Sequence, residues 1–278
     1  MSNLLLPAVF VFIFGAIIGS FLNVVIYRFN TGRSLGGRST CPVCTKTLHW
    51  PELLPIVSFI FLRARCRACR AKISWQYPLV EFLTAALFLA IFLWQWPQGA
   101  SLGLGFKDAP WGLFFWWIIM AILVVITVYD LRHKIIPDFF VYSLILLALG
   151  RLFWPQGASL GLGFKDAPLL WDHLLAGLGL FAFFALLWAA GRGRWMGFGD
   201  AKLALAVGLL LGPAGGISAI IFAFWSGALA GIALLLLNKR YTIKSGVSLK
   251  SEIPFAPFII FGFLLNLLCG LNLFSQIF

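Results

Sequence analysis

Residues 197–213 read GFGDAKLALAVGLLLGP and place a carboxylate on glycine-rich backbone at the start of an apolar segment. About 12 residues separate Asp200 from Gly212-Pro213, so a helix here is only ~18 Å long. The hydrocarbon core is roughly 30 Å thick, so a full crossing would draw Asp200 inside the membrane boundary. An ionisable residue there is a functional candidate, because its charge is costly. Gly197 and Gly199 allow close backbone approach and positive φ, which suits a carboxylate aimed at an extended peptide.

The composition around this stretch is that of a polytopic membrane protein. The chain has 278 residues, of which 62% are hydrophobic and 11% charged, and the usual composition of soluble domains does not fit. Apolar segments long enough to cross a bilayer are expected at about Leu4–Tyr27, Leu79–Trp96, Trp111–Tyr129, Phe139–Trp154, His173–Gly191, Ile217–Leu237 and Phe255–Phe278. With the short segment Asp200–Leu211, eight spans are predicted.

The basic residues predict the orientation of these spans. Eighteen of the 21 Lys and Arg residues fall on one side, leaving Lys107, Arg151 and Lys165 opposite. By the positive-inside rule the side with 18 is cytoplasmic, and both termini lie across the membrane from it. The net charge of +12 is therefore mostly a topology signal that suits anionic membrane lipids, and it gives little support for nucleic-acid binding.

The expected cytoplasmic connection between the first two spans, about Phe29–Pro78, is too small to build a strong core without a staple. It holds two CxxC pairs 21 residues apart, Cys41 with Cys44 and Cys66 with Cys69. This spacing is typical of a structural tetrahedral zinc site. A pair of disulfides is the alternative, but it requires an oxidising compartment. Cys269 stands alone in the last span and is expected to be a small core residue.

Asp130 is the other acid that a purely structural role does not explain. It follows an apolar run at the cytoplasmic end of the third span, where a helix C-terminus disfavours negative charge. Asp138 and Asp172, by contrast, are expected in the first turns of helices. If Asp130 and Asp200 face one another, they can share a proton, one activating water while the other polarises a carbonyl. A proton or ion relay and two unrelated boundary acids remain alternatives at this point.

A 15-residue block, WPQGASLGLGFKDAP, occurs unchanged at Trp96–Pro110 and again at Trp154–Pro168. Both copies are expected in loops on the outer face, where insertions are tolerated. We interpret the repeat as a duplication rather than as a functional pair.

These motifs together resemble the type IV prepilin peptidases, which are bifunctional leader peptidases and N-methyltransferases. The similarity runs along nearly the whole chain and is carried by Gly19-Ser20-Phe21-Leu22-Asn23-Val24 with Tyr27-Arg28, both CxxC pairs, Ile73-Ser74-Trp75 with Tyr77-Pro78-Leu79-Val80-Glu81, Asp130 through Ile136-Pro137-Asp138, the GxGD motif with Lys202, and Ile253-Pro254-Phe255-Ala256-Pro257-Phe258. The sequence departs from the family pattern in the duplicated block and in Gln76, where a basic residue is expected.

The resemblance implies an all-α, eight-span aspartic peptidase of the bacterial inner membrane, with Asp130 and Asp200 as its catalytic pair at the cytoplasmic face. Gly197, Gly199 and Lys202 then support the second aspartate. The implied substrates are prepilins and pseudopilins, and S-adenosylmethionine is the implied donor for methylation of the new amino terminus.

The methyltransferase or substrate-binding candidates are less sharply defined, and they are Gly19, Ser20, Asn23, Arg28 and Glu81. Glu52 and Glu81 are also candidate contacts for a basic leader, the alternatives being a solvated Glu52 and a Glu81 held in a buried ion pair. The expected division is a first span at residues 1–28, a zinc loop at 29–78 and a peptidase core at 79–278.

Two other functions remain open on the sequence alone. A proton-coupled transporter would use the same aspartates as a relay, but no acid lies on the outward half of any expected span. A membrane-anchored zinc module would recruit a partner, but an anchor needs one or two spans rather than eight.

Overall fold

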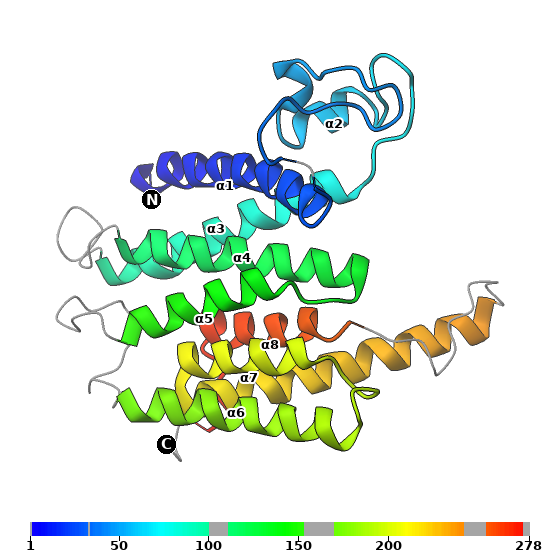
Figure 1. The fold of residues 1–278 in the computed structure, drawn as a ribbon. Helices are drawn as coiled ribbons and strands as arrows, with labels where there is room; N and C mark the ends of the chain where they lie inside the picture. Colours follow the sequence, from blue (N-terminus) through cyan, green and yellow to red (C-terminus); the bar gives the residue numbers. More distant parts are fainter. Residues whose placement is uncertain (1, 33, 100–110, 153–169, 242–253, 275–278) are drawn as a thin grey trace. The chain divides into compact units, whose positions relative to one another are not determined.

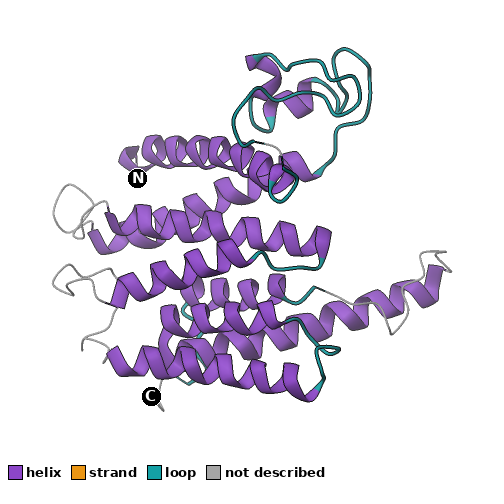
Figure 2. Ribbon diagram, viewed as in Figure 1, coloured by secondary structure: helices purple, strands orange, loops and turns teal. Residues whose placement is uncertain are grey.

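The computed structural model describes residues 2–32, 34–99, 111–152, 170–241 and 254–274. Within these ranges the chain is helical with connecting loops, and Figure 2 shows no strand in them. The described residues form two compact units, one reaching Val128 and the other starting at Tyr129. Each unit has its own packing and is described separately.

The first unit is built on close contact between α1 (Ser2–Arg28) and α3 (Gln76–Gly99). A Cβ atom at Gly15 would lie 2.7 Å from Cα of Ala85, and one at Gly19 would lie 2.7 Å from Cα of Glu81. Glycines four residues apart let two membrane helices approach at backbone distance. The GxxxG pattern at Gly15 and Gly19 therefore sets the packing of this pair.

The first part of α4 (Trp111–His133) completes this unit. The Trp117 ring stacks on Phe88 of α3 with centroids 5.1 Å apart. Its Nε1 donates to the Phe88 carbonyl at 3.1 Å. The connection from α1 to α3 carries the short helices η1 (Trp50–Leu53) and α2 (Val57–Phe61).

The second unit contains the last residues of α4 together with α5 (Asp138–Leu152), α6 (Leu170–Ala190), α7 (Phe198–Tyr241) and α8 (Ala256–Cys269). In this unit α7 packs against α5, α6 and α8. Figure 1 shows that α5, α7 and α8 begin at the same end of the unit.

Helix α7 is a hairpin of two helical halves. Gly212 has φ 71° and ψ −171°, and Pro213 follows it. The chain turns back so sharply that a Cβ atom at Gly216 would lie 3.3 Å from Cα of Gly208. The break that the sequence predicts at Gly212-Pro213 is confirmed.

The all-helical membrane fold is also confirmed. Five helices are long and apolar enough to cross a bilayer among the described residues, namely α1, α3, α4, α6 and α7, and α8 is a shorter apolar helix. The total of eight crossings stays a prediction. The expected last span, Phe255–Phe278, is wrong in extent, because α8 ends at Cys269 and Gly270 takes a left-handed conformation that stops it.

The two copies of the repeated block fall almost entirely outside the described residues. Only the first four residues of the first copy, at the end of α3, lie within them.

Candidate functional site

Asp130 lies near the end of α4 in a buried position. The residue is 4% exposed, and its Oδ2 atom has no hydrogen-bond partner. The backbone N–H of Ala256, the first residue of α8, interacts with this carboxylate. A buried carboxylate with an unsatisfied oxygen is costly to keep, so the position invites a functional explanation.

Asp200 lies in the first turn of α7 and is 6% exposed. Its backbone N–H donates to the Gly197 carbonyl at 3.2 Å, and the Gly197 N–H interacts with its carboxylate. Asp130 lies close enough to Asp200 for the charges of the two carboxylates to interact. The fold therefore places in one region two acids that are 70 positions apart in the sequence.

The glycines of the GxGD motif meet one of the two expectations for them. Neither Gly197 nor Gly199 has a positive φ, so that expectation is wrong. Close approach does occur at Gly199, where a Cβ atom would lie 2.8 Å from Cβ of Ile136. The motif thus seats the start of α7 against the residues that precede α5.

Lys202 joins the starts of α5 and α7. Its Nζ atom lies 2.6 Å from Oδ1 of Asp138, whose side chain is 62% exposed. The same ammonium lies 4.9 Å from the ring centroid of Tyr142. Because Lys202 pairs with Asp138, it supports the site by holding two helix ends together.

The four cysteines of the loop form one cluster. Their sulfur atoms all lie within 4.8 Å of one another and can hold a metal ion. The Cys41 and Cys69 sulfurs are 3.8 Å apart, and a tetrahedral zinc site with Zn–S bonds of about 2.3 Å separates its sulfurs by about 3.8 Å. A disulfide requires about 2.05 Å, and these cysteines are unbridged, so the alternative of two disulfides is wrong.

The two CxxC turns have the same local geometry. Cys41 donates its N–H to Lys46 and Cys66 to Ala71, at 3.0 and 2.8 Å. The residue after each second cysteine, Thr45 or Arg70, has a positive φ. Isolated bridges close both turns, Thr40 with Thr47 and Arg65 with Lys72. Two matching turns that present four thiols to one point are what a tetrahedral metal site requires.

The backbone of these turns favours a thiolate. The N–H groups of Cys44 and Val43 lower the pKa of Cys41 to about 6. The N–H of Ala71 acts in the same direction on Cys69, but desolvation and hydrogen bonds shared with the other thiols prevail and raise its pKa to about 11. A metal ligand must be deprotonated, so Cys41 is the thiol already prepared for binding.

The α1 and α3 candidates also gather in one place. The Ile56 N–H donates to Oε2 of Glu81 at 2.7 Å, and Ser20 is a second partner of this carboxylate. Asn23 donates to the carbonyls of Gly19 and Tyr77, and its Oδ1 atom is buried without a partner. The expected ion pair at Glu81 is absent from the described residues, and a backbone N–H takes its place.

Arg28, the last residue of α1, contacts the loop that follows this helix. Its guanidinium donates to backbone carbonyls of the following loop, those of Ser34, Leu35, Gly36 and Arg38. Arg28 therefore orders the exit from α1.

Sequence comparison gives these sites a family context. Residues 13–95 match the model of the bacterial Peptidase A24 N-terminal domain, and residues 117–233 match that of the type IV leader peptidase family. A prepilin leader peptidase/N-methyltransferase of Bacillus subtilis is 32% identical over 266 residues, covering 95% of each chain. The chain belongs to the type IV leader peptidase family.

Further relatives in this family carry the same name. That of Aeromonas hydrophila is 32% identical, with 94% of this chain and 90% of the relative covered. That of Pectobacterium carotovorum is 30% identical, with 94% and 93% covered. No solved structure matches the chain. Membership and the apolar helices make it a multi-pass membrane protein, and the transporter interpretation has no support.

Two smaller expectations fail for local reasons. Glu52 is not simply solvated, because its Oε2 accepts the His49 N–H at 2.8 Å and caps η1. Cys269 is exposed and not part of the core.

Sequence reasoning also missed the packing role of Gly19, which the spacing to Gly15 signals. It missed His173 and Arg151 as partners of backbone carbonyls in α7, and no local pattern indicates those contacts.

Proposed function

We propose that this protein is an aspartic peptidase that removes the leader of prepilins and pseudopilins at the cytoplasmic membrane face and then methylates the new amino terminus. What supports the proposal is that Asp130 and Asp200 are both buried in the second unit and close enough for their charges to interact. Family membership supports the substrate class, because the curated relatives are named prepilin leader peptidase/N-methyltransferases.

In the proposed peptidase reaction the two carboxylates share one proton. The ionised carboxylate takes a proton from a water molecule, which attacks the scissile carbonyl, while the protonated one donates to the carbonyl oxygen. Burial serves this chemistry because two adjacent carboxylates in a dry site cannot both ionise. The Ala256 N–H orients Asp130, and the Gly197 N–H orients Asp200.

We assign the cysteine cluster to a structural zinc ion held by Cys41, Cys44, Cys66 and Cys69. The fit rests on the sulfur spacing and on the two matching turns. Bound zinc supplies a cross-link that closes the loop at residues 29–78. Four protein ligands leave no open position, so the ion takes no part in the peptide chemistry.

For methylation we propose a site beside Glu81 and Asn23 in the first unit. The unsatisfied Oδ1 of Asn23 and the carboxylate of Glu81 are acceptors that fit the amino and hydroxyl groups of S-adenosylmethionine. When bound, this donor supplies a methyl group for the amine. Gly19 and Arg28 contribute by packing and loop order rather than by contact.

The peptidase proposal is tested with Asp130→Asn and Asp200→Asn, each assayed on a prepilin in detergent. Asparagine keeps the shape of the side chain but cannot act as a base, so each variant is expected to lose at least about 10³-fold in cleavage rate. Asp172→Asn is the matched control, because Asp172 is an exposed first-turn acid of α6. Cleavage near the wild-type rate in either site variant would sink the assignment.

The methylation proposal needs a separate readout, the mass of the released pilin. Glu81→Gln and Asn23→Ala are expected to give cleaved product without the added methyl group. Product that is methylated normally in both variants moves the donor site elsewhere.

A further inference from the structure

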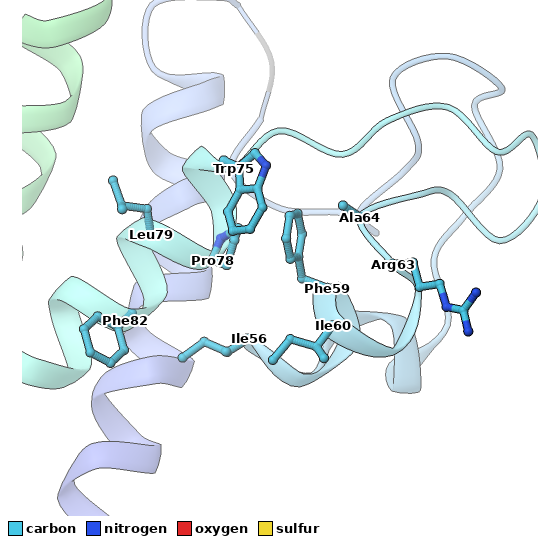
Figure 3. A pocket seen from close by; sticks show the side chains of 9 residues that line it. All are labelled: Ile56, Phe59, Ile60, Arg63, Ala64, Trp75, Pro78, Leu79 and Phe82. Atoms are coloured by element: carbon cyan, nitrogen blue, oxygen red, sulfur yellow. The ribbon is translucent and has the colours of Figure 1, made fainter.

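A hollow of about 530 Å³ opens in the first unit between α2 and the start of α3 (Figure 3). Its walls are almost wholly apolar, and the residues that line it include Phe59, Ile60, Arg63, Trp75, Leu79 and Phe82. The rings of Phe59 and Trp75 meet edge to face, with centroids 4.9 Å apart. The contact between these two rings gives the hollow an aromatic wall.

A partly buried hydrogen bond joins the two sides of this hollow. The Ile56 N–H donates to the Glu81 carboxylate at 2.7 Å, which fixes the residue before α2 onto α3. Ile56 also has a positive φ of 60°, a conformation that costs a β-branched residue and needs such support. This hydrogen bond holds the loop against α3, and the hollow lies beside it.

The position of the hollow is that of a membrane interface. Leu79 and Phe82 lie in the first turns of α3, which is long and apolar enough to cross a bilayer, and they are 65% and 57% exposed. On the loop side, Ile60 and Phe61 of α2 are 66% and 82% exposed. Apolar and aromatic side chains gathered at the end of a membrane helix are typical of the zone where headgroups meet acyl chains.

Charged groups at the hollow include Arg63 and the Glu81 carboxylate, which the Ile56 N–H already engages. Arg63 is the charged residue of its lining, and Figure 3 shows the guanidinium at the opposite end from Phe82. The sequence contains no acid between Glu52 and Glu81, while Arg65, Arg67, Arg70 and Lys72 follow Arg63. An apolar hollow with a cation in its lining matches the polarity of an anionic phospholipid, which joins apolar acyl chains to a charged phosphate.

We propose that this hollow binds one anionic phospholipid, with an acyl chain along Phe59, Leu79 and Phe82 and the phosphate on Arg63. An extended peptide fits less well, because its backbone N–H and C=O groups would find few polar partners among the lining residues. The proposal does not depend on the proposed enzymatic activity.

The test is native mass spectrometry of the full chain in detergent, titrated with phosphatidylglycerol and with phosphatidylcholine of the same acyl chains. Arg63→Gln is expected to weaken phosphatidylglycerol binding about fivefold, the effect of one cation near an anionic lipid surface. Arg65→Gln is the matched control, because Arg65 is an exposed arginine on the same loop and outside the lining. It is expected to leave the affinity nearly unchanged.

A second pair of variants tests the apolar wall. Ile60→Asn is expected to weaken the binding of phosphatidylglycerol about tenfold, whereas Phe61→Asn, on the same helix but outside the lining, is not. The proposal is overturned if the members of each pair behave alike, if phosphatidylcholine binds as tightly as phosphatidylglycerol, or if a prepilin peptide displaces the lipid and Ile60→Asn weakens only the peptide.

Discussion

A side chain from α6 contacts the break in α7. In an unbroken helix the Leu209 carbonyl would accept the N–H of residue 213, but that residue is Pro213 and has no N–H. The structure places Nδ1 of His173 at 2.8 Å from this oxygen. A carbonyl only accepts, so Nδ1 is the donor. The neighbouring Leu210 carbonyl accepts from Arg151 at 3.4 Å, so side chains of α6 and α5 supply donors to two carbonyls at the break.

His173→Leu removes the donor and leaves the Leu209 carbonyl buried without its partner. The cost of such an unsatisfied group is about 1–3 kcal/mol in the free energy of unfolding. For a chain of this size each kcal/mol lowers the unfolding temperature by roughly 2–4 °C. We therefore expect His173→Leu to unfold several degrees below the wild type when the soluble fraction in detergent is followed against temperature.

His173→Asn is the matched control, because its amide nitrogen takes the place of Nδ1 and can donate to the same carbonyl. Asparagine is expected to recover at least half of the loss, despite its smaller volume. If the leucine and asparagine variants unfold at the same temperature, His173 acts by filling space, and the hydrogen-bond explanation is refuted.

Three further predictions concern Lys202, Gly19 and the cysteine cluster. Lys202→Gln is expected to slow prepilin cleavage by no more than about fivefold, because its partner Asp138 is largely exposed and such a pair contributes up to about 1 kcal/mol; complete loss would place Lys202 in the chemistry itself. Gly19→Val should force α1 from α3 and cost about 1–3 kcal/mol, with methylation falling more than cleavage, whereas Gly150→Val meets no neighbouring atom and should change neither; equal effects would contradict this division. Zinc retention should fall with pH: the lowered pKa of Cys41 means that its thiolate stabilises the folded loop fully above about pH 9 and loses this contribution as pH falls through about 6, so a colorimetric chelator should capture zinc readily at about pH 5, and retention unchanged at that pH would argue against thiolate ligation.

Much of the fold follows from local sequence patterns. Runs of apolar residues predicted the helical segments to within a few residues at most ends, since burial in hydrocarbon and backbone hydrogen bonding leave a membrane chain few alternatives to helix. Gly212-Pro213 predicted the break in α7 because proline lacks an N–H and glycine tolerates positive φ. The CxxC spacing predicted the metal-binding cluster, because two short turns are enough to present four thiols.

The sequence by itself thus determined the helices, the turn in α7 and the cysteine cluster, all of which depend on residues near one another in the chain. Only the tertiary structure decided that Asp130 lies near Asp200 and that Glu81 accepts a backbone N–H from Ile56. These relations join helices far apart in sequence. Which helices meet, and in what register, is set by the sum of many weak packing contacts that no local pattern records.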